Sequence, residues 1–238
     1  MHFLDATLPS LAENVALDEA LLLAAECGDS GEVLRFWEWP TPAVVLGTGG
    51  RLADDVEEVA CAADAVPIAR RSSGGGTVLL GRGCLIYSLV LSYDHDSALN
   101  DIRLSYRFIL DRIGQPLAES VGVVEQAGIS DLTLAGRKFS GTAQQRKRNF
   151  LLHHGTILYD ADLSLMTRYL REPPRRPVYR ADREHLDFIC NLPLPGDEIK
   201  RRLRQAWQAD AISSVWPAEE VRRLVADKYA KQEWIRKR

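Results

Sequence analysis

Residues 70–78 hold the densest group of side chains that could bind an anion. The run reads Arg-Arg-Ser-Ser-Gly-Gly-Gly-Thr-Val, with two cations, two hydroxyls and three glycines in succession. Glycine lets a ligand approach the backbone closely, and successive amides in such a loop form an anion-binding concavity. The guanidinium groups of Arg70 and Arg71 add a fork that matches phosphate or carboxylate. The alternative is a glycine hairpin between strands 66–69 and 77–80, but the paired arginines favour a ligand-binding loop.

Two further segments stand downstream of this loop. Residues 136–143 read Gly-Arg-Lys-Phe-Ser-Gly-Thr-Ala, and residues 152–158 read Leu-His-His-Gly-Thr-Ile-Leu. Together with the glycine run, these motifs resemble the lipoate–protein ligase family and its lipoyl- and octanoyltransferase relatives. The resemblance continues in residues 14–22, 39–47 and 188–192, so it covers about residues 1–195 in one colinear order.

The resemblance implies an acyl transfer that joins lipoate or octanoate to a specific lysine of an acceptor domain. Ligases of this kind first activate the carboxylate with ATP as an acyl-adenylate, whereas transferases take an acyl group from a carrier. Lys138 matches the lysine of the family's Lys-x-Ser-Gly motif. Beside a mixed anhydride, its compact cation can neutralise the phosphate and polarise the acyl carbonyl as negative charge develops there.

The other site residues are carried over from the matching motifs as two walls around the acyl-adenylate. The first wall is the loop of Arg70, Arg71, Ser73, Gly74, Gly75, Gly76, Thr77 and Val78. The second wall comprises Asp131, Ser140, Gly141, His154, Gly155 and Thr156. Either arginine could instead be a structural ion-pair partner, and a hydrogen-bonded, structural His154 is favoured over a proton relay.

Some family members hold the acyl group on a thiol. One transferase type carries its cysteine around positions 127–128 of this chain and another near position 180, and neither place has one. Cys190 lies in the exit segment outside those positions, and Cys84 replaces a frequent asparagine on an apparently buried strand. The thiol mechanism is therefore disfavoured, with Cys84 kept open because it follows the glycine loop closely.

ATP and Mg²⁺ are implied as cofactors if the activation step is retained, with lipoate or octanoate as substrate. Two departures bear on that step. Many ligases continue the glycine loop with His-Asp, where this chain has Leu80-Gly81, and the chain after Leu192 is short for a large accessory domain. The expected partners are a lipoyl-acceptor domain protein and, to explain both departures, a separate accessory subunit. Alternatives are a carrier-dependent octanoyltransferase, biotin attachment, and a non-catalytic lipoyl-binding subunit.

Composition sets wider limits. A chain of 238 residues with 46% hydrophobic content can bury a large core. No apolar run approaches the ~18–20 residues that span a bilayer, and the N-terminus lacks a signal-peptide pattern. Four dispersed cysteines without a CxxC pair predict no metal site and a cytoplasmic location. A net charge of −3 gives no reason to expect nucleic-acid binding.

Periodicity and turn residues predict the elements that must position these motifs. Ser10 and Glu13 form a capping-box pattern before a helix that ends near Gly28. Helices are predicted at 54–63, 100–117, 163–170, 196–209 and 217–236. Strands are predicted at 32–39, 43–46, 84–93, 131–134, 138–144 and 151–159, the first two joined as a hairpin.

Irregular interspersion of helices among these strands predicts an α+β fold with a mixed, largely antiparallel sheet flanked by helices. The resemblance implies the same class II synthetase-like sheet that biotin ligases share. We expect a catalytic domain over 1–195 and a helical C-terminal extension over 196–238 packed on it. Arginine-rich stretches at 171–183 and 200–238 could steer an acidic acceptor, or could simply be solvated surface.

Overall fold

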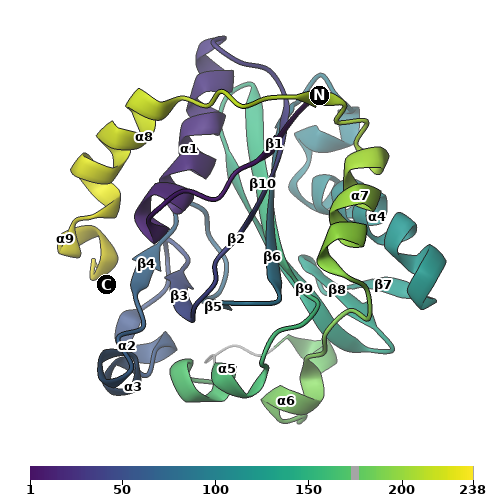
Figure 1. The fold of residues 1–238 in the computed structure, drawn as a ribbon. Helices are drawn as coiled ribbons and strands as arrows, with labels where there is room; N and C mark the ends of the chain where they lie inside the picture. The colour runs from purple at the N-terminus through teal and green to yellow at the C-terminus, as the bar shows by residue number, and fades with distance from the viewer. Residues whose placement is uncertain (173–176, 238) are drawn as a thin grey trace.

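An eight-stranded sheet crosses the computed structural model, which describes residues 1–172 and 177–237 (Figure 1). From edge to edge its strands are β11 (Ala211–Ile212), β1 (His2–Asp5), β2 (Val33–Glu38), β6 (Cys84–Ser92), β10 (Phe150–Leu158), β9 (Arg137–Arg146), β8 (Asp131–Leu134) and β7 (Val124–Ala127). β1 runs parallel to both of its neighbours, and the other pairs are antiparallel. The predicted α+β fold with a mixed, largely antiparallel sheet is confirmed.

A second sheet has three strands, in the order β4 (Ile68–Arg70), β3 (Ala43–Leu46) and β5 (Val78–Leu80). β3 lies in the middle, parallel to β4 and antiparallel to β5. The glycine run between β4 and β5 is therefore a crossing connection and not a hairpin. The predicted hairpin at 32–46 is wrong, because β2 and β3 belong to different sheets.

Helix α1 (Leu11–Cys27) is confirmed at both ends. Ser10 and Glu13 form the expected capping box, and Gly28 ends the helix in the left-handed region at φ 84°. The helix packs against β6 and β10 on one side and against α8 (Ala218–Leu224) and the π-helical turn η3 (Val225–Tyr229) on the other. Because it is covered from two directions, α1 buries polar side chains as well as apolar ones (Figure 1).

The opposite face of the large sheet is covered by α4 (Ile102–Val121) and α7 (Gly196–Ala206), which pack against each other (Figure 1). Their buried residues include Ile113 and Leu203, which belong to one apolar cluster with the sheet residue Leu89. The predicted helices over 100–117 and 196–209 are therefore present, with ends shifted by a few residues.

The predicted helix at 54–63 is two short helices, α2 (Leu52–Asp55) and α3 (Glu58–Ala63), because Val56 is extended and bridges Leu170. The remaining short elements are η1 (Ser97–Asn100), α5 (Ser164–Tyr169), η2 (Val178–Arg180) and α6 (His185–Phe188). No element had been predicted at β1, β7 or β11.

The C-terminal residues return to the body of the molecule. The predicted helix at 217–236 is α8, η3 and a final short helix, α9 (Gln232–Ile235), which lies beside β4. α7 packs on α4, and α8 packs on α1. Residues 196–237 are thus attached at both faces of the large sheet, while the boundary at residue 195 stays a prediction.

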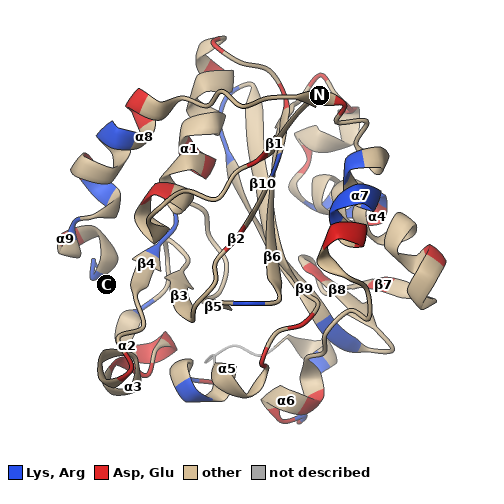
Figure 2. Cartoon of the chain, viewed as in Figure 1, with Lys and Arg blue, Asp and Glu red and all other residues tan. Residues whose placement is uncertain are grey.

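The cation-rich C-terminal stretch is interleaved with acidic residues (Figure 2). In α7, Arg201 and Arg202 both pair with Glu198, and in α8 Arg223 pairs with Glu220. The stretch therefore does not present a uniformly positive surface. Part of the other arginine-rich stretch, residues 173–176, lies outside the described residues. Within the described chain, no helix combines the length and apolar character needed to cross a membrane.

Candidate active site

A cavity of about 150 Å³ opens between the two sheets and the glycine loop. Its apolar lining residues include Val15, Trp37, Val45, Val78, Leu80 and Ile86. Its polar lining residues include Asp18, Arg71, Asp131, Lys138, His154 and Thr156. Such a cavity suits a ligand with an apolar chain and a polar head.

Lys138 is one of the polar residues that line the cavity, and it forms an ion pair with Asp131. Its Nζ lies 2.9 Å from Asp131 Oδ1, and the Tyr179 hydroxyl donates to Asp131 Oδ2 at 2.6 Å. The Lys138 side chain is 30% exposed, so a ligand and solvent can both reach it. A Cβ on Gly141 would lie 2.8 Å from Lys138 Nζ, so glycine at this position lets the lysine side chain cross the strand without displacement.

A β-bulge decides which way Lys138 points. β8 and β9 pair Leu132 with Ser140 but Thr133 with Lys138, so Phe139 is the extra residue. In unbroken alternation Phe139 would share the cavity face with Gly141. The bulge instead sends Phe139 into the core on the other face, where it is fully buried, and turns Lys138 to the cavity.

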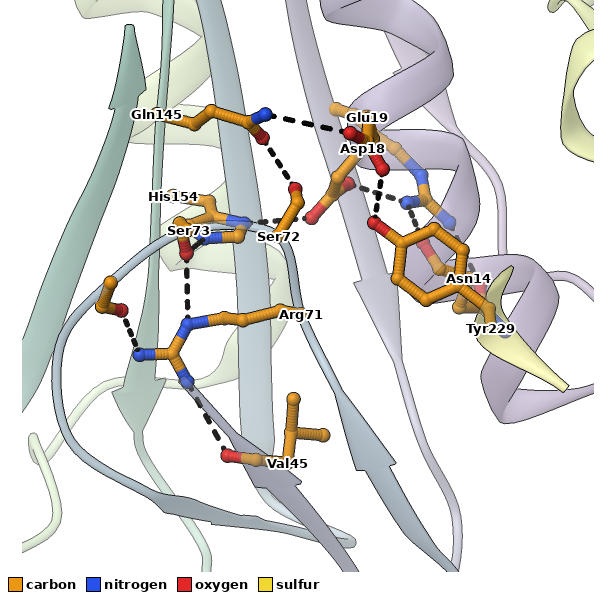
Figure 3. Close-up of polar contacts among 12 residues, drawn as sticks. Asn14, Asp18, Glu19, Val45, Arg71, Ser72, Ser73, Gln145, His154 and Tyr229 are labelled. Carbon is orange, nitrogen blue, oxygen red and sulfur yellow. Dashed lines mark hydrogen bonds and ion pairs between the residues drawn. The ribbon is translucent and has the colours of Figure 1, made fainter. Parts of the chain in front are cut away.

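Arg71 holds the glycine loop in shape (Figure 3). Its Nη2 donates to the carbonyls of Gly74 and Gly76 at 2.6 and 2.8 Å, and its Nε donates to Ser73 Oγ at 2.9 Å. Burial lowers the pKa of Arg71 to about 10, so the group is still a cation at neutral pH. These hydrogen bonds of Arg71 go to atoms of the loop, and its side chain also lines the cavity.

The loop amides are left for a ligand. Among the described residues, the N–H groups of Gly74, Gly75 and Gly76 donate no intramolecular hydrogen bond, and Gly75 and Gly76 line the cavity. Gly75 has φ 84°, a left-handed conformation that glycine tolerates. Unpaired amides beside a guanidinium have the arrangement that an anion-binding concavity requires, and anion binding by this loop stays a prediction.

Ser73, His154 and Asp18 are connected in series behind the loop (Figure 3). Ser73 Oγ lies 2.6 Å from His154 Nε2, and His154 Nδ1 lies 2.9 Å from Asp18 Oδ2. The order matches that of a serine hydrolase triad. However, Ser73 is only 1% exposed, does not line the cavity, and accepts a hydrogen bond from Arg71. The series therefore orients Arg71 and supplies no nucleophile.

Asp18 also anchors a buried cation. Arg35 is fully buried, and its Nη1 lies 2.7 Å from Asp18 Oδ1. Nη2 of Arg35 donates to Asn14 Oδ1 at 2.8 Å. Burial alone would raise the pKa of Asp18, but the His154 hydrogen bond and the Arg35 charge together bring it below 3.8. Asp18 therefore stays ionised and fixes both partners.

Arg70 does not reach the cavity. It is fully buried and donates to the Ile235 carbonyl from Nε and Nη2, at 3.0 and 2.7 Å. Its Nη1 donates to the carbonyls of Gly47 and Gly50 at 2.9 and 2.7 Å. The structure thus uses Arg70 to tie α9 to the base of the loop, and not as the anion-binding fork expected from the sequence.

A second set of contacts links the C-terminal segment to the same loop (Figure 3). Glu19 Oε2 accepts from the Tyr229 hydroxyl at 2.6 Å and from Lys228 Nζ at 2.7 Å. Gln145 bonds to the Ser72 hydroxyl and lies 3.5 Å from Glu19. The loop is therefore held by α1, β9 and η3 at once.

A smaller cavity of about 110 Å³ lies on the other side of Lys138. It shares Thr77, Val78, Lys138, Gly141 and Thr156 with the first cavity. Its own lining includes Ser140, Met166, His185, Phe188 and Ile189. Lys138 thus lines both cavities.

Most predicted residues meet at this place. Those that line the first cavity are Arg71, Gly75, Gly76, Thr77, Val78, Asp131, Lys138, Gly141, His154, Gly155 and Thr156. Ser140 lines only the second cavity, and Arg70, Ser73 and Gly74 line neither.

Sequence reasoning missed Asp18, Trp37 and His185. Asp18 carried a signal, since with Asn14 it places two polar groups one turn apart among the apolar positions of α1. Trp37 lies in a predicted strand, where alternation alone does not say which face meets a cavity. No sequence pattern marked His185, because its place in the second cavity depends on how residues 177–190 pack against β9.

Packing of the loop against β3 gives a direct prediction. A Cβ on Gly47 would lie 2.1 Å from the Gly75 carbonyl oxygen, while nothing lies within 4 Å of a Cβ on Gly49. We expect Gly47→Ala to displace the loop, lower stability by about 1–3 kcal/mol and reduce acyl transfer. Denaturant unfolding and a transfer assay measure both. Gly49→Ala is the matched control, and equal behaviour of the two variants would contradict the role of this contact.

The described residues offer no ready metal centre. No group of three or more His, Cys, Asp or Glu side chains there could hold an ion. The two carboxylates that line the first cavity, Asp18 and Asp131, are both ion-paired.

Known proteins share this sequence and fold. The family model of the lipoyl protein ligase A/B catalytic domain matches residues 10–208. The octanoyltransferase LipM of Carboxydothermus hydrogenoformans is 33% identical over 186 residues, covering 71% of this chain and 69% of that protein. A probable lipoate-protein ligase A of Mycoplasma pneumoniae is 32% identical over 158 residues, covering 66% of this chain and 45% of that protein.

The fold has a solved counterpart in a bi-partite lipoate protein ligase of Thermoplasma acidophilum, studied with its E2 lipoyl domain. The two chains align with a TM-score of 0.82 at 21% identity, over 99% of this chain and 95% of the other. The family match, the relatives and the shared fold confirm the resemblance that the motifs indicated. The chain is an enzyme of the ligase and acyltransferase kind, and it belongs to the lipoyl protein ligase A/B catalytic domain family.

Proposed function

We propose that this enzyme attaches a lipoyl or octanoyl group to a lysine of an acceptor domain by way of an acyl-adenylate. The acyl chain lies along the apolar wall of Val15, Trp37 and Ile86. Its carbonyl sits at Lys138, and the adenylate phosphate lies against the free amides of Gly75 and Gly76.

Lys138 would stabilise charge in two places. As the acceptor amine adds to the carbonyl, negative charge grows on the carbonyl oxygen and then on the departing phosphate. A fixed cation beside both is worth far more in a half-buried site than in water. The ion pair with Asp131 holds Lys138 in position before the substrate arrives.

The free loop amides beside Arg71 and Lys138 are the observation that carries the adenylate part of this proposal. The absence of a suitable thiol supports direct attack by the acceptor amine. All four cysteines lie in the described part of the chain, and none of them lines either cavity beside Lys138. Burial raises the pKa of Cys84 to about 12, and burial also raises the pKa of Cys190. A thiolate is the reactive form, so neither group is suited to hold an acyl thioester. The amine therefore attacks the activated acyl group directly.

This mechanism predicts that thiols are dispensable. Cys190 is the cysteine nearest to Lys138 along the exit segment, where its amide donates to the Lys138 carbonyl at 2.9 Å. We expect Cys190→Ala to keep the acyl-transfer rate within about threefold of wild type, since Cys→Ala removes only a weakly polar side chain. Treatment with iodoacetamide should be equally harmless. An acylated cysteine trapped by mass spectrometry would contradict this mechanism.

A second candidate is transfer of octanoate from a carrier thioester without ATP. The 33% identity to an octanoyltransferase favours it. The same cavity would hold the octanoyl chain, and Lys138 would face a departing thiolate instead of a phosphate. The two reactions differ only in how the acyl group is activated.

ATP and Mg²⁺ belong to the first candidate alone. The free loop amides, Arg71 and Lys138 fit an adenylate, but no described residues form a separate Mg²⁺ cage. Mg²⁺ commonly binds through substrate phosphates with few protein ligands, so it would arrive with ATP. The ion would assist activation, while the chain's own residues bind the acyl-adenylate and orient its carbonyl.

The partners follow from the same chemistry. The acceptor is a lipoyl-acceptor domain, and an accessory subunit is a further proposed partner for activation. The Thermoplasma counterpart is itself bi-partite, which supports this second partner.

The intact mass of a lipoyl-acceptor domain tests the proposal. The enzyme is incubated with the domain and either lipoate, ATP and Mg²⁺, or octanoyl-carrier protein without ATP. A mass gain of one lipoyl group that requires ATP supports the adenylate route. A gain only from the carrier supports the octanoyltransferase and overturns the adenylate route. Preformed lipoyl-adenylate separates lost activation from lost transfer.

A further inference from the structure

His185 has an unexplained position in the second cavity. It is the first residue of α6, and this helix ends immediately before Ile189. The backbone of Ile189 forms a β-bridge with Lys138, and the Cys190 amide donates to the Lys138 carbonyl. These backbone contacts hold α6 against β9 at the level of Lys138. His185 and Lys138 therefore line the same cavity.

The ring of His185 has a buried nitrogen with no partner. Its Nε2 is inaccessible to solvent and makes no hydrogen bond to any described residue. A buried polar atom without a partner is unfavourable, because it has lost its hydrogen bonds to water without replacing them. The unpaired Nε2 of His185 in the cavity that Lys138 also lines is explained if a substrate group supplies the missing hydrogen bond.

The surroundings keep His185 uncharged. Burial lowers its pKa below 6.5, and the cations Arg180 and Lys138 lower it further. Glu172 acts in the opposite direction, but the net shift is downward. At neutral pH the ring is therefore a neutral imidazole, which can accept a proton.

The acceptor lysine must lose a proton during the reaction. Its free ammonium has a pKa near ~10.4 and cannot attack until it is deprotonated. Once the amine has added to the carbonyl, its nitrogen is positively charged and strongly acidic. A neutral imidazole within reach is a competent acceptor for that proton.

We propose that His185 accepts the proton that the acceptor amine releases when it attacks the acyl group held at Lys138. This inference rests on the proposed acyl transfer to lysine. The acyl chain occupies the first cavity and the phosphate lies on the loop amides, so the amine enters through the second cavity. That approach brings its nitrogen to the side of the carbonyl where His185 lies.

The bonds and charges balance in this step. The acceptor lysine reacts as the free amine, its ammonium proton having passed to water. The amine lone pair forms the new C–N bond, and the carbonyl pair moves onto oxygen beside Lys138. The proton passes from the amine nitrogen to His185 Nε2. The C–O bond to the phosphate then breaks, AMP leaves with that electron pair, and the imidazolium returns its proton to water.

The test uses the full chain, preformed lipoyl-adenylate and two nucleophiles. One nucleophile is the lysine of a lipoyl-acceptor domain. The other is hydroxylamine, a far weaker base, whose adduct with the carbonyl is acidic enough to lose its proton to water without a general base. We expect His185→Gln to slow transfer to the acceptor lysine by about 10²-fold or more. Release of lipoyl hydroxamate should stay near the wild-type rate. His95→Gln, at a histidine that pairs with Glu32 away from both cavities, is the matched control.

The pH profile gives a second readout. Below the lowered pKa of His185, wild-type transfer should rise with pH more steeply than transfer by His185→Gln, which keeps only the rise caused by deprotonation of the acceptor ammonium. Equal slowing with both nucleophiles would overturn the proposal, because it would mean that His185 only supports the fold or binds the adenylate. Transfer to lysine within about threefold of wild type would overturn it as well. If wild type transfers to neither nucleophile, the proposed function itself is refuted and this inference with it.

Discussion

Lys138→Ala should reduce acyl transfer to the acceptor domain by about 10²–10³-fold, the usual loss when one electrostatic stabiliser is removed. Lys138 is the only lysine that lines either cavity in the described chain. Without it, Arg71, which is hydrogen-bonded to the loop carbonyls, is the remaining cation among the described residues that line the first cavity. Single-turnover transfer from preformed lipoyl-adenylate measures the chemical step without activation or product release.

The control for this variant is Lys147→Ala, which removes an exposed lysine from the turn after β9. Its transfer rate should equal that of wild type. Thermal unfolding should show that both variants are folded, because Lys138 is partly exposed and has one ion-pair partner. Near-normal turnover in Lys138→Ala would remove Lys138 from the mechanism.

Asp18→Asn should destabilise the protein by about 3–5 kcal/mol, the usual cost of breaking a buried ion pair. The substitution leaves the Arg35 guanidinium fully buried without its carboxylate, 2.7 Å away in the wild type. It also removes the carboxylate that holds His154, so Ser73 and Arg71 lose their orientation. Denaturant unfolding measures the first effect and acyl transfer the second.

The pH dependence of stability distinguishes this pair from simple packing. The folded-state pKa of Asp18 lies below 3.8, so its stabilisation is present above that value and is lost as pH falls through the folded pKa. Wild type should therefore lose this stability in acid, and Asp18→Asn should show a flatter acid limb. Asp111→Asn, in an exposed pair with Arg107, should cost only about 0–1 kcal/mol. Equal destabilisation by both substitutions would refute the buried-pair argument.

Local sequence signals predicted α1, α4, β6, β8, β9 and β10 because each depends on neighbouring residues. A capping box with a glycine stop defines α1, and alternation or helical spacing defines the others. The hairpin at 32–46 was wrong because the Pro-Thr-Pro turn is compatible with either a hairpin or a change of sheet. Residues 54–63 divided into two helices because Val56 bridges Leu170, a contact that no local pattern contains.

The site residues divide in the same way, into those that local sequence identified and those whose role depends on distant contacts. Lys138, Gly141 and the glycine loop were identified by residue type and order, and they meet in one cavity. Arg70 and Arg71 are adjacent and chemically identical, yet one is tied to the carbonyl of Ile235, 165 positions away, while the other organises the loop. Sequence could not separate them, because the difference lies in which distant carbonyls come within reach.

The sequence by itself determined the family, the chemistry available and most of the elements, since motifs and periodicity are properties of neighbouring residues. Only the tertiary structure decided where the groups point. The bulge at Phe139 turns Lys138 into the cavity, and the contact of Ile189 with Lys138 brings His185 beside it. Both depend on pairing between separate segments, where a shift of one residue moves a side chain to the opposite face of the sheet.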